Sequence, residues 1–250
     1  GKIVMITGGS GTIGFAIAEA FSKLGAQTIL VDKDETALKK AVTKLGVGHA
    51  YFPIDVTEAD AADQAMIAAI QNFGGLDILV SNAGAAHAGP MLSISNDELR
   101  NAFELNFFSH YSFSTEAAKI LKNQNRGGQI LFNISKQAVN PGKNFGAYGL
   151  PKATTFFLMR QLALELGSDG IRVNGINADR IRSGLLTDDF ISSRSKSRGV
   201  SETEYMAGNL LNKEVKAEHV ANAFTSLACA ESTTGHVMTV DGGNIEASLR

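Results

Sequence analysis

The stretch Lys2-Ile-Val-Met-Ile-Thr-Gly-Gly-Ser-Gly-Thr-Ile-Gly14 runs from a short apolar segment directly into a glycine-rich turn. Residues 13–24 then have the apolar periodicity of a helix and stop at a glycine, a residue suited to a left-handed helix end. In a strand–turn–helix context, the helix start offers free N–H groups and partial positive charge to a phosphate. We therefore expect a dinucleotide site in which Gly8 permits the turn, Gly11 admits a pyrophosphate and Gly14 packs the helix against the sheet.

Apolar runs alternate with helical patterns along the rest of the chain. The predicted strands are 2–6, 28–31, 49–52, 76–80, 129–132, 171–176 and 236–240. Strands separated by helices of this length form right-handed crossovers in a parallel sheet, and continuous apolar strands fit a sheet covered on both faces. We predict one α/β domain over residues 1–250, a Rossmann-type doubly wound parallel sheet of about seven strands with helices on both faces.

Composition narrows the class of protein. A chain of 250 residues that is 44% hydrophobic can bury a large core. Its net charge of −2 gives no reason to expect nucleic-acid binding, and no apolar run approaches the ~20 residues of a membrane span. No leader resembles a signal peptide, and the one cysteine, Cys229, cannot form an internal disulfide and is expected to be buried. We predict a cytoplasmic protein.

A second decisive stretch is Ala147-Tyr-Gly-Leu-Pro-Lys-Ala153, in which Tyr148 and Lys152 are four residues apart. Positions i and i+4 share one face of a helix, so a phenol and an ammonium there can act on one substrate atom. Ser135 lies thirteen positions before the tyrosine. Together with the glycine turn, this pattern predicts an alcohol or carbonyl redox enzyme that uses a nicotinamide cofactor.

The second predicted strand ends at Asp32, eighteen residues after Gly14. A carboxylate there can accept hydrogen bonds from both ribose hydroxyls and would repel a 2′-phosphate, which favours NAD over NADP. Lys33 would partly offset that repulsion. The alternative is a solvated carboxylate at a strand end.

These elements, in this order, resemble a short-chain dehydrogenase/reductase of the shorter branch over essentially the whole chain. Further matching elements are Asp55-Val56, Ser81-Asn-Ala-Gly84 and Gly242-Gly243. The cofactor-binding residues that the resemblance implies are Gly8, Ser10, Gly11, Thr12, Ile13, Gly14, Asp32, Asp55, Val56, Asn82, Ala83, Gly84, Tyr148, Lys152, Ile181 and Ser183.

The resemblance also implies four catalytic residues. Tyr148 is expected to be the general acid/base, with its pKa lowered from about 10 by the Lys152 cation. Lys152 is also expected to bind the nicotinamide ribose, and Ser135 to stabilise charge on the substrate oxygen. Asn106 would hold a proton-relay water, the alternative being a structural helix residue. No residue is assigned to a metal.

The sequence departs from the family pattern at three places. Thr12 stands where the turn usually has glycine, which indicates a locally rearranged phosphate turn. Lys136 follows Ser135 where a small residue is usual. Ala178-Asp179 replaces the Pro-Gly that normally shapes the nicotinamide pocket, so the geometry of that pocket is open.

Lys136, Arg180 and Arg182 should border the pocket if the family fold holds. Three cations near a hydride-transfer site favour an anionic or polyhydroxylated substrate. An equally good interpretation is ordinary loop charges or ion pairs with Asp179 and Asp188.

Two other segments are candidates for substrate contact. Residues 183–213 form a long polar insertion, interpreted as a substrate loop, although a solvated surface excursion also fits. His87, after the fourth strand, is a possible substrate contact, although a plain loop histidine fits better.

Two helical segments, around 97–123 and 148–166, are apolar on more than one side. The sheet covers one side, and a second subunit would cover the rest, so the family resemblance implies a dimer or tetramer. The alternative is an entirely internal core.

Asn177-Ala-Asp-Arg180, the stretch 209–215 and the ending Val240-Asp-Gly-Gly-Asn244 are similar to a narrower group, in which a dehydrogenase domain follows a class II aldolase-like domain. These are rhamnulose-phosphate aldolase/lactaldehyde dehydrogenase-like fusions, and a chain that starts at Gly1 without an initiator Met would fit a trimmed fusion. We expect NAD-dependent hydride transfer to or from a secondary alcohol, its carbonyl form or a hydroxyaldehyde. The alternatives are a catalytically weak NAD sensor and a structural domain of a fusion.

Overall fold

The computed structural model describes residues 1–86 and 88–244. Seven strands form one sheet in the order β3-β2-β1-β4-β5-β6-β7, and every neighbouring pair is parallel. The strands are β1 (Ile3–Thr7), β2 (Gln27–Asp32), β3 (Ala50–Pro53), β4 (Ile78–Ser81), β5 (Gly128–Asn133), β6 (Ile171–Ala178) and β7 (Val237–Val240). The predicted fold class is therefore confirmed.

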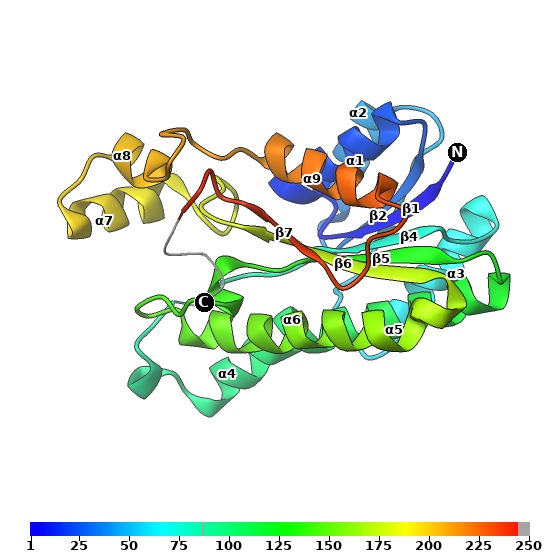
Figure 1. The fold of residues 1–250 in the computed structure, drawn as a ribbon, viewed down its shortest axis with the longest axis horizontal. Coiled ribbons are helices and arrows are strands. Elements are labelled where there is room, and N and C mark those ends of the chain that lie inside the picture. The colour runs from blue at the N-terminus through cyan, green and yellow to red at the C-terminus, as the bar shows by residue number, and fades with distance from the viewer. Residues whose placement is uncertain (87, 245–250) are drawn as a thin grey trace.

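Helices cover both faces of the sheet (Figure 1). One face carries α1 (Thr12–Lys23), α2 (Glu35–Leu45) and α9 (Ala217–Cys229). The other face carries α3 (Ala61–Phe73), α5 (Ser109–Gln124) and α6 (Gly146–Leu166), with α4 (Asn96–Phe103) packed beside α6. Of the helices described, none is long and apolar enough to cross a membrane.

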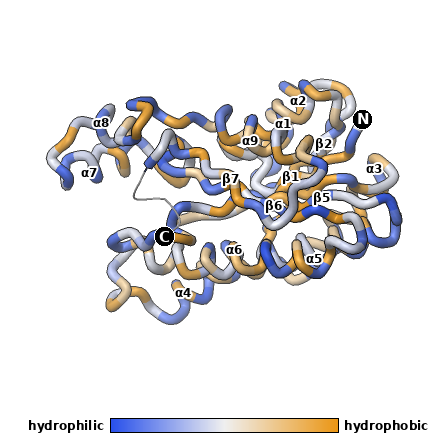
Figure 2. The backbone as a smooth tube through the Cα atoms, in the orientation of Figure 1, coloured by the Kyte–Doolittle hydropathy of each residue, from blue (hydrophilic) through white to orange (hydrophobic). Residues whose placement is uncertain are grey.

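The sheet divides the core into two apolar clusters. Val4 and Ile6 of β1 pack with Phe224 of α9, whereas Met5 between them packs on the other face with Phe113 of α5. This follows from the strand period of two, which sends successive side chains to opposite faces. Apolar residues accordingly concentrate along the strands and the helix segments beside them (Figure 2).

The chain reverses its direction across the sheet at β1 and β4. From β1 the chain winds outward to β3, and from β4 it winds the other way to β7. The loops that leave the two central strands therefore diverge and open a crevice at the carboxyl edge of the sheet. This crevice is where the expected site should lie.

The polar segment 183–213 is not an irregular loop throughout. It contains α7 (Asp188–Arg198) and α8 (Glu202–Ala207), whose N-termini are capped by Thr187 and Ser201. A small separate cluster holds the two helices together and consists of Leu186, Ile191, Tyr205 and Met206. The pair extends beyond the carboxyl edge of the sheet (Figure 1).

The expectation that Cys229 is buried is wrong, because this side chain is exposed. The buried side of α9 is formed by Val220, Phe224 and Leu227. Cys229 follows Leu227 by two positions, which places it on the opposite side of the helix.

Candidate active site

A cavity of about 670 Å³ occupies the crevice at the carboxyl edge of the sheet. It is large enough for a cofactor-sized ligand. Every predicted cofactor-binding residue lines it except Ser10, and so do Ser135, Lys136 and Arg180. Asn106 and Arg182 do not line it, and His87 lies outside the described residues.

The glycine turn is built for a close backbone approach. Gly8 has φ +64°, a left-handed conformation that favours glycine, and a Cβ on Gly14 would lie 2.1 Å from the Gly8 carbonyl oxygen. No side chain caps the start of α1 at Gly11. The first amides of α1 therefore remain available at the cavity wall, an arrangement that suits a phosphate.

Asp32 is tied to this turn. Its Oδ2 accepts hydrogen bonds from the Ser10 amide at 3.2 Å and from the Ser10 hydroxyl at 2.7 Å. Ser10 thus supports the turn through Asp32 and does not itself line the cavity. Lys33 lies 3.6 Å from Asp55, so its charge is directed toward a second carboxylate.

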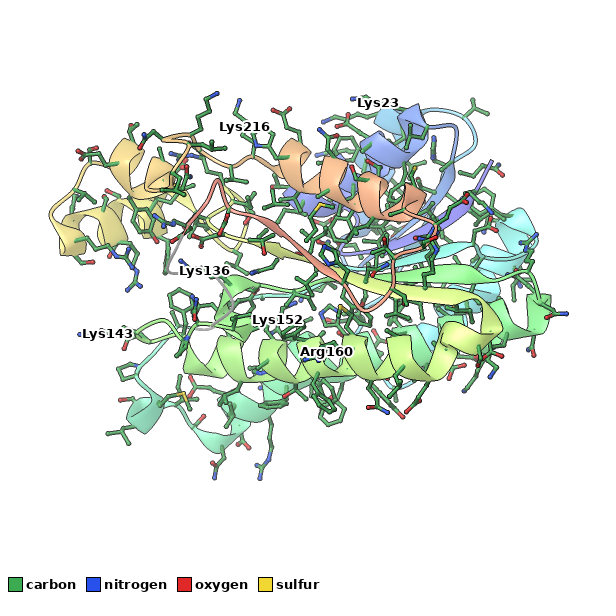
Figure 3. The ribbon with its side chains drawn as sticks, viewed as in Figure 1. Lys23, Lys136, Lys143, Lys152, Arg160 and Lys216 are labelled. Atoms are coloured by element: carbon green, nitrogen blue, oxygen red, sulfur yellow. The ribbon has the colours of Figure 1, made fainter. Side chains whose placement is uncertain are left out.

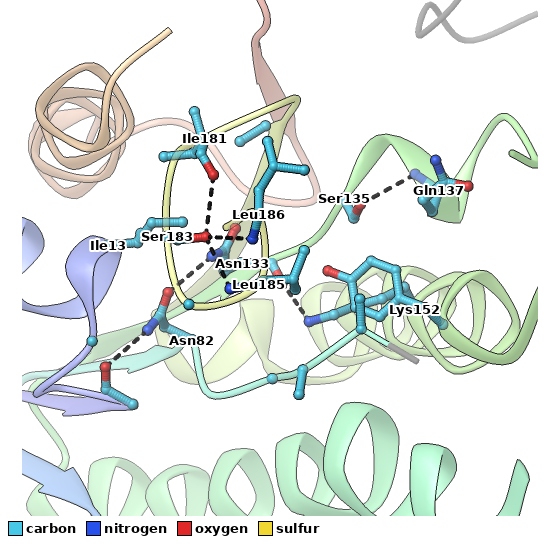
Figure 4. Close-up of a pocket in the computed structure, with 18 of the residues that line it drawn as sticks. Ile13, Asn82, Asn133, Ser135, Gln137, Lys152, Ile181, Ser183, Leu185 and Leu186 are labelled. Carbon is cyan, nitrogen blue, oxygen red and sulfur yellow. Dashed lines mark hydrogen bonds between the residues drawn. The ribbon is translucent and has the colours of Figure 1, made fainter. Parts of the chain in front are cut away.

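The loops after β1 and β4 are fastened together by Asn82. Its backbone amide donates to the Thr7 hydroxyl at 2.9 Å, and its Nδ2 donates to the Thr7 carbonyl at 2.9 Å. Asn133, at the end of β5, donates from Nδ2 to Asn82 Oδ1 at 2.9 Å (Figure 4). Sequence reasoning missed Asn133, whose only signal is its place at the carboxyl end of a predicted strand.

The predicted catalytic trio comes together at the other end of the cavity. Tyr148 lies in the first turn of α6, and its hydroxyl hydrogen-bonds with Ser135. Ser135 follows β5 and accepts a further hydrogen bond from the Gln137 amide at 3.2 Å (Figure 4). Lys152 lies one turn along α6, with its Nζ 5.9 Å from the centre of the Tyr148 ring.

The pKa of Tyr148 differs from the sequence expectation. Burial raises the pKa of this phenol to about 12, and the hydrogen bond with Ser135 opposes the rise. The expected lowering by Lys152 is absent, because burial lowers the pKa of that ammonium to about 7 and so weakens its charge near neutral pH.

Lys152 has a buried neighbour that the sequence did not reveal. Its Nζ donates to the Asn133 carbonyl at 3.0 Å and lies 3.2 Å from Nε2 of His110. The other ring nitrogen of His110 lies 2.6 Å from the Ser81 hydroxyl. Burial and the Lys152 charge hold the pKa of His110 well below its usual value, so the neutral ring can accept from the lysine. The signal that was missed is that His110 follows Asn106, a predicted site residue, by four positions.

Asn106 lies in a π-helical segment, Glu104–Phe108, between α4 and α5. Its Nδ2 donates to the carbonyls of Ala85 and Ala102, and its Oδ1 is buried and has no hydrogen-bond partner among the described residues. Its backbone carbonyl accepts from the Thr155 hydroxyl at 2.7 Å. Asn106 therefore supports the loop after β4 from behind the cavity wall, and its part in a relay stays a prediction.

The three predicted substrate cations are held in ion pairs. Lys136 and Arg180 both contact the buried Asp179 at 3.0 Å. Arg182 does not line the cavity and pairs with Asp188 and Glu214. The ion-pair interpretation is thus the one that the structure supports, and Ala178-Asp179 provides a carboxylate anchor in place of a turn.

Because burial lowers the pKa of Lys152 to about 7, stability should depend on pH. Between pH 7 and 9 this lysine binds more protons in the unfolded protein, where its pKa has the ordinary value near 10.5, than in the folded protein. The free energy of unfolding of the parent should therefore rise with pH by up to ~1.4 kcal/mol per unit relative to Lys152→Met. Urea denaturation of both proteins at pH 7, 8 and 9 measures this difference; parallel pH profiles would contradict it.

Comparisons with known proteins agree with this geometry. A family model described as enoyl-(acyl carrier protein) reductase matches residues 9–244. The uncharacterized oxidoreductase YuxG of Bacillus subtilis is 33% identical over 97% of this chain, which spans 37% of the length of that protein. A 3-ketoacyl-(acyl-carrier-protein) reductase from Brucella melitensis, solved with NADH, superposes with a TM-score of 0.86 at 26% identity, covering 97% of this chain and 98% of that one.

An L-sorbose reductase from Gluconobacter frateurii, solved with NADPH and L-sorbose, superposes with a TM-score of 0.87 at 30% identity. The match covers 97% of this chain and 96% of that one. The family model, these relatives and the parallel sheet with its glycine turn all lead to one assignment. The chain belongs to the short-chain dehydrogenase/reductase family of oxidoreductases.

Proposed function

We propose that this protein is an NAD-dependent oxidoreductase that interconverts a secondary alcohol and its carbonyl form, or acts on a hydroxyaldehyde. The observation that carries the proposal is that Ser135, Tyr148 and Lys152 line the same cavity as the glycine turn, with Tyr148 and Lys152 one helical turn apart on α6. A bound nicotinamide would accept or supply the hydride. The residues of this chain would bind the substrate oxygen and move its proton.

Each member of the trio has a distinct task. Tyr148 transfers the proton between the substrate oxygen and the protein. Ser135 donates to the same oxygen and stabilises charge that develops there. Lys152 stabilises the phenolate form of Tyr148 when it is protonated, and its buried position keeps that interaction out of water.

We propose NAD as the cofactor because Asp32 presents a carboxylate at the far end of the cavity, where a 2′-phosphate would be repelled. Replacing Asp32 by Ala should raise the NADP to NAD ratio of kcat/KM by about tenfold or more. Steady-state kinetics with both cofactors measures the ratio.

Asp34→Ser is the matched control for this change. It removes a carboxylate two positions away and retains a side-chain oxygen to cap α2. The ratio should stay within twofold to threefold of the parent in the control. An unchanged ratio in Asp32→Ala would remove the assigned ribose role.

The reaction itself is tested by following NAD reduction over polyols, hydroxy acids, sugar acids and lactaldehyde. Similarity to an L-sorbose reductase supports the inclusion of polyhydroxylated compounds. NAD binding without turnover of any compound would favour the sensor alternative.

We also propose that this domain acts as part of a fusion with an aldolase-like domain and as a dimer or tetramer in the cytoplasm. The fusion is supported by the sequence similarity noted above and by the greater length of the related Bacillus protein. The assembly is supported by apolar side chains left exposed on α5 and α6: Tyr111, Leu150, Phe157 and Leu164. Light scattering of the purified chain tests the assembly.

A further inference from the structure

The catalytic end of the cavity carries an excess of positive charge. The cationic side chains that line it are Lys136, Lys143, Lys152, Arg180, Arg194 and Arg198. Asp179 is the one carboxylate among the described residues that line this end, because Asp32, the last residue of β2, and Asp55, after β3, lie in the other half of the sheet. Figure 3 labels Lys136, Lys143 and Lys152 near the N-terminal end of α6. Such a charge distribution attracts anions.

Half of these cations already have partners. Lys136 and Arg180 share Asp179, and Lys152 is directed to the Asn133 carbonyl and His110. Within residues 1–86 and 88–244, no carboxylate pairs with Lys143, Arg194 or Arg198. The cations that have none of these partners, Lys143, Arg194 and Arg198, therefore lie on α7 and on the loop before α6.

Arg194 is held in place without being neutralised. Its guanidinium carbon lies 5.4 Å from the ring centre of Phe145 and 5.9 Å from that of Phe190, and the two rings contact each other edge to face at 5.9 Å. Its Nε is shielded from solvent and has no hydrogen-bond partner among the described residues. Aromatic contacts fix the plane of a guanidinium and leave its N–H edge for a planar anion.

The position of Arg194 relates it to the chemistry. Phe145 immediately precedes α6, three residues before Tyr148. The Phe145 contact therefore links α7 directly to the helix that carries the general acid/base. Arg198, one turn after Arg194 on α7, also lines the cavity and lies 5.4 Å from the ring centre of Tyr205. Two guanidinium groups thus line the catalytic end of the cavity from one side of one helix.

We propose that Arg194 and Arg198 bind an anionic group of the substrate, a carboxylate or a phosphate, while its alcohol or carbonyl group lies at Tyr148 and Ser135. This inference rests on the proposed function, because it names the substrate class of the same site. It replaces the earlier candidates Lys136, Arg180 and Arg182, each of which already contacts a carboxylate. Planar guanidinium groups suit both anions through paired N–H donors.

The test compares matched substrates that differ in the anionic group. One pair is 3-hydroxybutyrate against 1,3-butanediol, and the other is glycerol 3-phosphate against glycerol, each with NAD. The variants are Arg194→Met, Arg198→Met and the double variant, with Arg194→Lys to retain charge. Arg160→Met is the matched control, because Arg160 also lies over a phenylalanine, Phe156, but on the part of α6 away from the cavity (Figure 3).

The parent should use the anionic member of at least one pair with a higher kcat/KM. Arg194→Met should lower that value by about 10- to 100-fold, and Arg194→Lys should restore part of it. The kcat/KM for the neutral member should change by less than about threefold in every variant. In Arg160→Met, the kcat/KM values for the anionic and the neutral member should both stay within the same limit. Which pair responds tells carboxylate from phosphate.

A calorimetric titration of the same anions, with NAD present, separates this inference from the proposed function. Binding that depends on Arg194 without turnover would retain the anion site and remove the oxidoreductase assignment. Turnover of the neutral members alone would retain the oxidoreductase assignment and remove the anion site. Equal losses for anionic and neutral members, with weaker NAD binding in Arg194→Met, would show that the arginines hold the cofactor and would overturn the inference.

Discussion

Tyr148→Phe should lower kcat/KM for alcohol oxidation by about 10²- to 10⁴-fold, the range expected when a general acid/base is removed. The substitution keeps the ring and removes the hydroxyl that hydrogen-bonds with Ser135. Tyr148 is almost fully buried and lines the cavity beside Ser135 and Lys152. The measurement is steady-state NAD reduction with the best substrate from the screen.

The pH dependence sharpens this expectation. Burial raises the pKa of Tyr148 to about 12, so the phenolate form is scarce at neutral pH and becomes more common as pH rises. The rate of alcohol oxidation by the parent should therefore increase from pH 7 to 9, and Tyr148→Phe should lose that increase.

Tyr111→Phe provides the control, because Tyr111 is exposed on α5 and does not line the cavity. It should retain parental turnover. NAD binding by Tyr148→Phe, followed by calorimetry, should change little compared with its turnover. Turnover of Tyr148→Phe within tenfold of the parent would show that another group carries the proton.

Sequence periodicity located the seven strands because each is a short apolar run followed by a turn, and parallel strands are buried on both faces. The glycine turn could be predicted in the same way. The positive φ angle of Gly8 and the close packing at Gly14 both require glycine at those positions. Such requirements are local in the chain. They can therefore be inferred before any tertiary contact is known.

Contacts between distant segments were not predictable in the same way. His110 approaches Lys152 across 42 positions, and Arg194 packs on Phe145 across a comparable separation. Lys136 and Arg180 line the cavity, but their pairing with Asp179 depends on the path of β6. Residue type predicted the charge, whereas only the fold decides which charges are neutralised.

The two helices in 183–213 show how a local signal can be overlooked. Ser201 and Glu204 form a capping box, and Thr187 caps α7, patterns that are visible in the sequence. The low apolar content of the segment nevertheless indicated a loop. Its helices are stabilised by few buried side chains, so composition understated their order.

Under the proposed mechanism, Lys152→Met should lower kcat/KM by about 10²- to 10³-fold, because it removes the cation to which we assign stabilisation of the Tyr148 phenolate. The substitution should not unfold the protein, since it replaces a buried ammonium, whose pKa is lowered to about 7, with an apolar side chain of similar length. Stability below pH 7 should stay equal or rise, which separates a catalytic loss from a structural one.

Two further measurements identify the origin of that loss. Lys40→Met, an exposed change on α2, is the control and should retain parental kinetics. In Lys152→Met the rate should rise more steeply from pH 7 to 9 than in the parent, because the parent loses the Lys152 charge, whose pKa is about 7, over the same range in which Tyr148 ionises more. A variant with parental turnover would mean that Lys152, despite its contacts with His110 and Asn133, only fills the core. A buried lysine that makes no functional contribution would only destabilise the fold. We therefore expect Lys152→Met to lower kcat/KM and not to retain parental turnover.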